Sequence, residues 1–498
     1  MIATGGQVGS PSVEPTFPPV PVATVAAAAG AEVFGDPATP VTEAAYDSRS
    51  VRPGSLFFCV RGEHADGHDL ADVALAAGAR AFVVERLLNI DAPQLLVASV
   101  RAAMGPMSAV VFGRPSESLE TVGVTGTNGK TTTTYLIEAI LAGVGVAPGV
   151  IGTTGARIRG RAVPLERTTP EAPDLHRLLA RMRDDGVKTV AMEVSSHALA
   201  QHRVDGVRVD VAVFTNLSQD HLDYHPSMDA YFDAKARLFT PEMAARGVVN
   251  GDDRFGRRLL DEPRIPLTTF GVDAEADLRA TDVVVDGAGV AFSLPGARVR
   301  SRLRGRFNVW NCLAAIAAAE ALGIDRAAAA EALGTLPVVP GRMEPVEEGQ
   351  DFLVVVDYAH TPDSILSVLR GARPLAAGRL IVVFGCGGDR DHAKRPLMGE
   401  AATSEADLTI LTSDNPRHED PLAIIGEIVP GAVAGGGAYR IEPDRRAAIA
   451  AAVAEAGPGD VVVIAGKGHE SSQEIGDDVL AFDDREVVRD ALRAGGRG

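Results

Sequence analysis

The sequence has few cysteines and no long apolar run, and each shortage excludes a class of protein. Its 498 residues include only three cysteines, Cys59, Cys312 and Cys386, without any CxxC pair. They provide neither a disulfide framework nor a structural zinc site. No apolar run reaches the roughly 18 residues that a membrane helix needs. The first basic residue is Arg49, so the early apolar stretch lacks the positive segment of a signal peptide. We therefore expect a cytoplasmic protein without membrane insertion.

Basic residues are also scarce relative to acidic ones. The chain has 48 Lys and Arg against 66 Asp and Glu, a formal net charge of −18. This balance argues against a nucleic acid or an anionic membrane held by bulk electrostatics. A phosphate ligand would instead need local basic side chains, backbone amides or a metal. The 46% of hydrophobic and 23% of charged residues are typical of a globular protein with real cores.

The length of the chain and its Pro- and Gly-rich segments predict an α/β protein of about three domains. Residues 1–21, rich in Gly, Pro and Ser, are expected to be a flexible tail. Pro and Gly cluster again near residues 113–116 and 338–342, where composition changes. The expected domains are therefore a small N-terminal α/β domain (22–115), a central P-loop NTPase-like parallel sheet (116–340) and a C-terminal Rossmann-like α/β domain (341–498).

Short apolar runs alternate with helical segments, which is the rhythm of parallel sheets. We expect strands at residues 56–60, 81–84, 119–124, 189–194, 209–214, 353–357, 380–384, 408–411 and 461–464, and helices at 133–141 and 308–322. Ligands bind beyond the carboxyl ends of parallel strands. The polar loops that follow these runs are therefore the expected places for chemistry.

A glycine-rich loop, GVTGTNGKTT at residues 123–132, lies between a predicted strand and a predicted helix. Its backbone N–H groups can face a triphosphate, Lys130 can bridge the outer phosphates, and the Thr131 hydroxyl can bind Mg²⁺. The strict phosphate-loop pattern has glycine where this chain has Val124, so we interpret the segment as a variant phosphate loop. The alternative is an ordinary glycine-rich turn. The candidate ATP-binding residues here are Gly126, Thr127, Asn128, Gly129, Lys130, Thr131 and Thr132.

Several motifs together resemble the Mur ligases, which build the peptidoglycan precursor. They are GTNGKTT at residues 126–132, MEVSSH at 192–197, TNLSQDHLD at 215–223, DYAHTPD at 357–363 and DNPR at 414–417. They follow the family's order across about residues 46–470 and are most similar to the type that adds the third peptide residue.

This resemblance implies an ATP-dependent carbon–nitrogen ligase with Mg²⁺ as cofactor. Its substrates would be ATP, UDP-N-acetylmuramoyl-L-alanyl-D-glutamate and diaminopimelate, joined through an acyl phosphate on the D-glutamate γ-carboxylate. The expected state is a cytoplasmic monomer. A lysine-adding homologue and a folylpolyglutamate synthase-like ligase are the alternatives within the superfamily. Outside it, the alternatives are a P-loop ATPase that works as a motor or switch and a non-catalytic binding module.

Metal and nucleotide ligands are expected at the sheet edge that carries the phosphate loop. Glu193 ends one predicted strand and His221 follows the next, so both reach that edge. The resemblance assigns Thr131, Glu193 and His221 to the metal, and Lys130, Lys235 and His221 to catalysis. It assigns four further residues to ATP, namely Asn308, Arg342, Asp357 and His360. From the residues alone, Asn308 and Asn311 could also cap the helix that begins there.

Lys235 lies in YFDAKARLF, residues 231–239, where aromatic and apolar residues recur at helical spacing. It is therefore expected on a half-buried face, and burial lowers the pKa of a lysine. A neutral amine can add CO₂ and form a carbamate. The matching lysine of the family is carbamylated and helps to hold Mg²⁺, and the resemblance implies this role for Lys235.

The resemblance also places the other two substrates. The residues implied for the uridine nucleotide and the muramoyl-dipeptide are Tyr46, Ser48, Arg49, Glu63, His64, Ala65, Thr168, Thr169, Ser195, Gln201 and Arg203. Those implied for diaminopimelate are Arg390, Asp414, Asn415, Pro416, Arg417, Gly466 and Glu470. Two Arg and one Glu fit the charges of diaminopimelate, whose second carboxylate lysine lacks.

Overall fold

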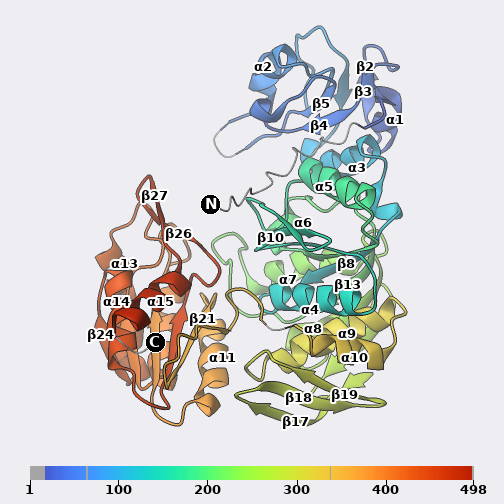
Figure 1. Ribbon diagram of the computed structural model, residues 1–498. Coiled ribbons are helices and arrows are strands. Elements are labelled where there is room, and N and C mark those ends of the chain that lie inside the picture. Colours follow the sequence, from blue (N-terminus) through green and yellow to red (C-terminus); the bar gives the residue numbers. More distant parts are fainter. Residues whose placement is uncertain (1–16, 63–64, 337, 496–498) are drawn as a thin grey trace, which may run out of the picture. The chain divides into compact units, whose positions relative to one another are not determined.

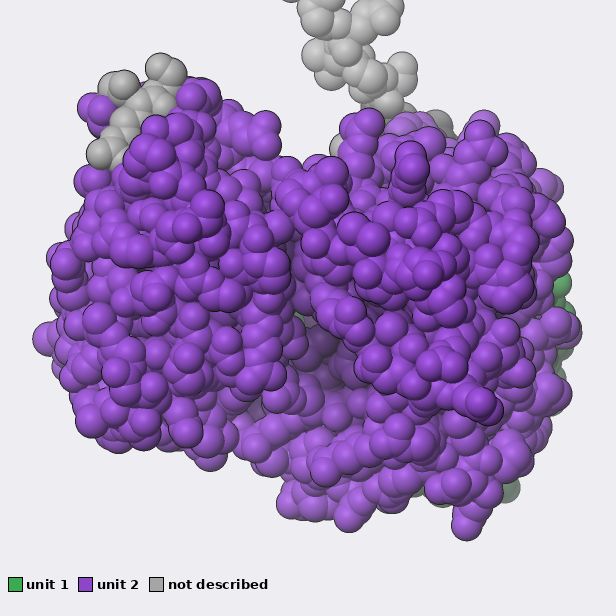
Figure 2. All heavy atoms as spheres, turned by 90° about the horizontal axis from the view of Figure 1, so that it is seen from below, with its two compact units in different colours: residues 1–119, 170–186, 201–207 green, residues 120–169, 187–200, 208–498 purple. Residues whose placement is uncertain are grey.

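The computed structural model describes residues 17–62, 65–336 and 338–495, which form two compact units (Figure 1). Unit 1 consists of residues 1–119, 170–186 and 201–207, and unit 2 of residues 120–169, 187–200 and 208–498 (Figure 2). Most of the predicted tail lies outside the described residues. The predicted α/β class is confirmed, whereas the three predicted domain boundaries stay predictions.

Unit 1 is built on a five-stranded sheet in the order β2-β7-β6-β5-β4, in which only β2 is antiparallel. Phe57, Phe58 and Phe82 are fully buried in its two cores. Its elements are β1 (Val20–Pro21), α1 (Val22–Ala27), β2 (Glu32–Phe34), β3 (Pro40–Val41), β4 (Glu43–Ala45), β5 (Ser55–Phe58), α2 (Ala71–Ala76), β6 (Ala81–Val84), β7 (Gln94–Leu96), α3 (Val100–Val111) and α5 (Ala172–Asp184).

Unit 2 contains a nine-stranded sheet in the order β11-β10-β9-β12-β8-β13-β14-β15-β16, parallel from β9 to β16. Its strands are β8 (Glu120–Thr125), β9 (Pro148–Gly152), β10 (Gly155–Ile158), β11 (Arg161–Val163), β12 (Thr189–Glu193), β13 (Val209–Phe214), β14 (Ala244–Asn250), β15 (Leu267–Gly271) and β16 (Leu278–Arg279). Because β8, β12 and β13 are parallel neighbours, the loops after them meet at one sheet edge.

Helices and a small antiparallel sheet complete this part of unit 2. Figure 1 shows α4, α9 and α10 beside one another, and α4 contacts both of the others. The small residues of the Ala-rich α9 favour a helix and allow this close packing. The elements are α4 (Lys130–Gly143), α6 (Ser196–Ala200), α7 (Met228–Ala236), α8 (Arg254–Asp261), β17 (Thr281–Asp286), β18 (Gly289–Leu294), β19 (Ala297–Ser301), α9 (Asn308–Ala321) and α10 (Arg326–Leu333).

A six-stranded sheet in the order β20-β21-β25-β22-β23-β24 forms the rest of unit 2, with only β20 antiparallel. Its strands are β20 (Glu344–Pro345), β21 (Leu353–Asp357), β22 (Leu380–Phe384), β23 (Leu408–Leu411), β24 (Ala438–Ile441) and β25 (Val461–Ala465). The other elements are α11 (Pro362–Ala372), α12 (Lys394–Glu405), α13 (Pro421–Gly435), α14 (Arg445–Glu455), the hairpin of β26 (Ser472–Ile475) and β27 (Asp478–Ala481), and α15 (Asp484–Ala494).

The predicted elements agree closely with these bounds. Five predicted strands coincide with β6, β13, β21, β22 and β23, and the others differ by one or two residues at an end. The predicted helix 133–141 begins earlier, at Lys130, because Gly129 (φ 87°) already provides its left-handed N-cap. Within the described residues no helix is long and apolar enough to cross a membrane.

Candidate active site

The phosphate loop joins β8 to α4, and its glycines are required by close neighbours. Gly126 has φ 146°, and a Cβ there would lie 1.9 Å from Thr215 Oγ1. A Cβ at Gly129 would lie 2.4 Å from Asn311 Oδ1. The loop is thus shaped by backbone conformations and contacts that only glycine allows.

Two predicted phosphate ligands are held inside this loop. The Lys130 ammonium donates to the carbonyl oxygens of Gly126 at 3.0 Å and Thr127 at 2.8 Å. Burial lowers the pKa of Lys130, although the nearby carboxylates of Glu193 and Asp220 oppose that shift. The Thr131 hydroxyl accepts a hydrogen bond from Arg342 Nη2 at 3.0 Å, so Arg342 lies at the loop as expected.

Two buried carboxylates lie beside the loop. Glu193 is 1% exposed at the end of β12, where Thr153 donates to it through its N–H at 2.8 Å and its hydroxyl at 3.0 Å. Asp220 was not among the predicted site residues. Burial alone would raise the pKa of Asp220, but the charges of His221 and other nearby cations lower it. Its only sequence signal was its place directly before His221.

His221 lies beside Asp220, and Lys235 lies beside the phosphate loop. His221 Nε2 lies 3.3 Å from Asp220 Oδ2, and its ring meets that of His197 edge-on at 4.7 Å. Lys235 is 1% exposed, donates to the Gly126 carbonyl at 2.9 Å and lies 4.6 Å from the centre of the Tyr231 ring. Burial, reinforced by Lys130, lowers the pKa of Lys235 well below its ordinary value. The predicted burial of this lysine is confirmed.

A cavity of about 590 Å³ in unit 2 is lined by Lys130, Thr131, Glu193, Asp220 and His221, whereas Lys235 does not line it. The predicted residues that line it are Thr127, Asn128, Gly129, Lys130, Thr131, Thr132, Thr168, Glu193, Ser195, His221, Arg342, Asp357 and His360. Asp357 is itself fixed by the N–H groups of Met343 at 2.8 Å and Ala359 at 2.7 Å. Aromatic side chains, Phe270, Phe307 and Trp310, also line the cavity, together with Asn311. Such a wall suits a nucleobase. Trp310 was not predicted, because nothing marked it in the sequence beyond its nearness to Asn308.

Asn308 does not cap α9, so that alternative is wrong. The N-cap residue is Phe307, which makes no side-chain capping bond. The Asn308 amide instead donates to the Arg304 carbonyl at 2.6 Å and accepts from the Asn311 amide at 2.8 Å. Asn308 is buried and does not line the cavity, whereas Asn311 does. Asn308 thus orients a cavity residue.

The loops predicted for diaminopimelate follow β22, β23 and β25, which are adjacent in the sheet. Asn415 donates to Glu470 at 3.0 Å, and the buried Lys467 donates to both of them at 2.9 Å. Lys467 was not predicted, although it lies in the same GKGHE segment as Glu470. At Gly466, a Cβ would lie 2.4 Å from Asp414 Oδ2. The structure therefore brings these loops into direct contact.

Arg417 and Arg390 differ in how firmly they are held. Arg417 has φ 51°; its Nε donates to Glu474 at 2.7 Å and its Nη1 to the Gly388 carbonyl at 2.8 Å. Arg390 is exposed and makes one long bond, 3.4 Å, to the carbonyl of Asp389. Glu474 was missed because it lies on β26, far from Arg417 in the sequence.

The residues predicted for the uridine nucleotide and the dipeptide are divided between the units. In unit 2, Thr169 donates to the Glu193 carbonyl at 2.9 Å, Thr168 lies 3.1 Å from the Thr153 hydroxyl, and Ser195 accepts from the Ala198 N–H. In unit 1, Tyr46 donates to Asp174 at 3.1 Å, Arg203 donates to Gln201 at 2.6 Å, and Arg49, 89% exposed, pairs with Asp47 beside Ser48. Ala65 is exposed, and Glu63 and His64 lie outside the described residues.

Sequence models of three Mur ligase regions match the chain in order. They are the "Mur ligase family, catalytic domain" at residues 40–112, the "Mur ligase middle domain" at 124–319 and the "Mur ligase, glutamate ligase domain" at 341–468. A curated protein of Geobacillus thermodenitrificans is 48% identical over 90% of this chain and 94% of its own length. The chain belongs to the Mur ligase family. That relative and one from Streptomyces avermitilis, 47% identical over 96% of this chain and 98% of its own, are named UDP-N-acetylmuramoyl-L-alanyl-D-glutamate--2,6-diaminopimelate ligase.

Solved structures of Mur ligases share the fold. A structure with that same name covers 96% of this chain and 100% of its own at 36% identity, with a TM-score of 0.70. MurF from Acinetobacter baumannii has a TM-score of 0.68 at 19% identity, covering 96% of this chain and 99% of its own. Folylpolyglutamate synthase from Mycobacterium tuberculosis reaches 0.60 at 18% identity, covering 78% and 94%. At these lower identities the likeness concerns the fold alone.

Proposed function

We propose that this Mur ligase adds diaminopimelate to the D-glutamate γ-carboxylate of UDP-N-acetylmuramoyl-L-alanyl-D-glutamate. The observation that carries the choice of amino acid is the state of Arg417. Its Nε and Nη1 are fixed by Glu474 and Gly388, while its Nη2 has no partner among the described residues. A fixed guanidinium with donors to spare suits a second carboxylate, which diaminopimelate has and lysine lacks. The names of relatives 47–48% identical support the same substrate.

In the proposed reaction, an oxygen of the γ-carboxylate attacks the γ-phosphorus of ATP, and ADP leaves. The amine of diaminopimelate then attacks the acyl carbon, loses a proton and displaces phosphate, which carries away the former carboxylate oxygen. Lys130 would exchange the carbonyls of Gly126 and Thr127 for the transferring phosphoryl group and stabilise its charge.

The donor set beside the loop fits Mg²⁺. This ion prefers oxygen ligands and keeps several waters, and it uses one or two carboxylates together with substrate phosphates. Among the described residues no group of three or more His, Cys, Asp or Glu could hold a metal alone, which is compatible with this mode. We assign Thr131, Glu193, His221 and Lys235 to the metal, and bound Mg²⁺ would neutralise phosphate charge there.

Lys235 would join that set as a carbamate. Its burial and the low pKa of its amine favour the neutral form, which adds CO₂ with loss of one proton. The product is an anion with two hard oxygen atoms next to the loop. It would also remove the repulsion between two ammonium groups, because Lys130 and Lys235 both donate to the carbonyl of Gly126.

The remaining residues that we assign to substrates belong to unit 1 or to unit 2. We assign the uridine nucleotide and the dipeptide to the unit 1 residues Tyr46, Ser48, Arg49, Glu63, His64, Ala65, Gln201 and Arg203 and to Thr168, Thr169 and Ser195 of unit 2. We assign ATP to the loop and to Arg342, Asp357 and His360, with Asn308 acting through Asn311. We further propose that the enzyme works as a cytoplasmic monomer in peptidoglycan precursor synthesis.

Omission of each substrate in turn tests the function. Phosphate release should require ATP, the UDP-dipeptide and diaminopimelate together, and the product should gain one diaminopimelate by mass. Phosphate release from ATP alone would favour a motor or switch ATPase. Equal use of lysine and diaminopimelate would contradict the role given to Arg417.

A further inference from the structure

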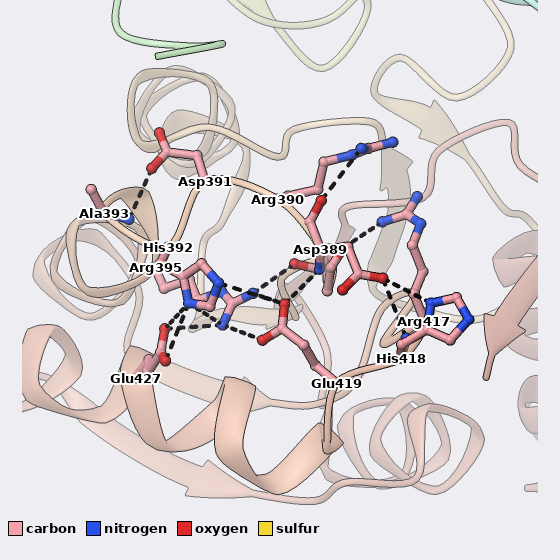
Figure 3. Close-up of polar contacts among 12 residues, drawn as sticks. Asp389, Arg390, Asp391, His392, Ala393, Arg395, Arg417, His418, Glu419 and Glu427 are labelled. Atoms are coloured by element: carbon pink, nitrogen blue, oxygen red, sulfur yellow. Dashed lines mark hydrogen bonds and ion pairs between the residues drawn. The ribbon is translucent and has the colours of Figure 1, made fainter. Parts of the chain in front are cut away.

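A buried arginine lies behind the two loops that carry Arg390 and Arg417. Arg395, near the start of α12, is 1% exposed and is one of the largest fully buried side chains. In the view of Figure 3, the guanidinium groups of Arg390 and Arg417 lie on one side of Asp389, and Arg395 and Glu427 lie on the other. Arg395 therefore contacts the loops from the side away from those two arginines.

The guanidinium of Arg395 makes a bidentate pair with one carboxylate. Its Nη1 donates to Glu419 Oε2 at 2.9 Å and its Nη2 to Glu419 Oε1 at 2.8 Å. Nη2 also donates to the Gly387 carbonyl at 3.2 Å, in the loop after β22. Nη1 makes a second ion pair with Glu427 Oε2 on α13 at 2.9 Å and lies 3.1 Å from His392 Nδ1.

Glu419 passes this contact on to both loops. Its Oε1 accepts from the Asp389 N–H at 2.5 Å, and its own N–H donates to the Pro416 carbonyl at 3.1 Å. The loops also touch directly, because a Cβ at Gly388 would lie 1.9 Å from the Pro416 carbonyl oxygen. Glu419 thus joins the residue before Arg390, through its carboxylate, to the turn that contains Arg417, through its own backbone N–H.

We propose that Arg395 and Glu419 are positioning residues for the amino-acid substrate, because they fix the Arg390 loop against the Arg417 loop. This inference rests on the proposed function and names residues that the sequence did not assign to the site. Neither side chain need touch the substrate. The pair would act by holding the two arginine-bearing loops in one geometry, so that both carboxylates of the substrate meet donors already in place.

Glu427 provides a matched control for this role. Like Glu419 it pairs with Arg395 Nη1 at 2.9 Å, but its other contact is with His392, at the far end of the Arg390 loop, and it bonds neither to Asp389 nor to the Arg417 turn. Removing the charge of Glu427 weakens one ion pair of the Arg395 guanidinium and leaves the bond between Glu419 and the Asp389 N–H in place. A merely structural role for the cluster predicts similar consequences for both glutamates, whereas a positioning role predicts different ones.

The test is steady-state kinetics of the full chain with Glu419→Gln, Glu427→Gln and Arg395→Lys. In Glu419→Gln, the KM for diaminopimelate should rise about tenfold, while the KM values for ATP and the UDP-dipeptide stay within about twofold. Arg395→Lys should behave like Glu419→Gln, because an ammonium group cannot form the bidentate pair that the guanidinium makes with the Glu419 carboxylate. Glu427→Gln should leave all three KM values within about twofold.

The melting temperature of each variant separates misfolding from misplacement. An unchanged KM for diaminopimelate in Glu419→Gln, or a parallel rise in all three KM values, would overturn the inference. The proposed function fails separately, if the wild-type enzyme makes no product with diaminopimelate. In that case a panel that includes lysine and glutamate identifies the amino acid that the enzyme uses. The KM values of the three variants are then compared with that amino acid.

Discussion

The phosphate loop of unit 2 and the loops that we assign to diaminopimelate are built in different ways. The phosphate loop is a contiguous segment whose glycines pack against neutral side chains, Thr215 and Asn311. The diaminopimelate loops are held by charged pairs between segments distant in the sequence, such as Arg395 with Glu419 and Arg417 with Glu474. A backbone cradle suits phosphate groups, and charged pairs suit a ligand that is told apart by its charges.

This difference predicts how each site should fail. Substitutions in the phosphate loop or among the proposed metal ligands should lower turnover with any amino acid. Damage to the charged pairs should alter the choice of amino acid and leave ATP binding intact.

The largest effect is expected at Lys235. Lys235→Ala should lower kcat by more than about 10³-fold, since the proposed carbamate and its two oxygen ligands are lost. Short carboxylic acids should restore part of the activity by filling the vacated space. Native mass spectrometry of the wild-type protein in CO₂-rich buffer should show one added carboxyl group, and full activity of Lys235→Ala without added acid would contradict the role.

Lys130→Ala should lower kcat by on the order of 10³-fold, because a charged group aimed at the transferring phosphoryl is removed. The loss should be the same with diaminopimelate and with lysine. Trp310, the only tryptophan of the chain, lines the cavity, so its fluorescence can report ATP binding separately from turnover. Lys188, an exposed lysine directly before β12, provides the control variant Lys188→Ala. Wild-type turnover in Lys130→Ala would refute the phosphate-loop assignment.

Arg417→Ala should lower kcat/KM for diaminopimelate by about 10²–10³-fold, since a site built for a carboxylate loses its donor. Use of lysine should change far less, and ATP binding should not change. Arg440→Ala, at an exposed pair with Glu455 on the edge strand β24, serves as the control. If the ratio of the two kcat/KM values is the same in wild type and Arg417→Ala, Arg417 does not read the second carboxylate.

The smallest effect concerns stability and pH. Hydrogen bonds from Arg395, and more weakly from the Asp389 N–H, lower the pKa of Glu419 to about 2 against the opposing effect of partial burial. A lowered pKa means that this stabilisation is complete above the unfolded value near 4.5 and is lost as the pH falls through about 2. Chemical denaturation should give Glu419→Gln a deficit of about 1–2 kcal/mol at pH 7 that shrinks between pH 4.5 and pH 2. A deficit that does not depend on pH would show that the charge of Glu419 is not what stabilises the loops.

The sequence predicted the strands and the phosphate loop well because both depend on local signals. Apolar runs define β13, β21 and β22, and the GTNGKTT segment itself contains the glycines that turn the loop and the lysine that gives it its charge. The burial of Lys235 was also readable, since aromatic residues recur around it at helical spacing.

Residues that act through distant partners were missed. Glu474 and Arg395 reach the site only when β26 and α12 pack beside the loops that follow β22 and β23. Asn308 was predicted to bind ATP, with a capping role as the alternative, but α9 starts from Phe307 and the amide turns to Arg304 instead. Neither outcome follows from spacing, because each depends on which chain segment occupies the neighbouring space.

In the proposed mechanism, ATP activates the γ-carboxylate as an acyl phosphate before the amine attacks. The most direct measurement uses UDP-N-acetylmuramoyl-L-alanyl-D-glutamate labelled with ¹⁸O in both oxygens of that carboxylate, followed by mass analysis of the released phosphate. The account predicts one ¹⁸O atom in each phosphate and one retained in the new amide. Phosphate without ¹⁸O would show that water, not the carboxylate, attacks ATP, and would contradict the ligase mechanism.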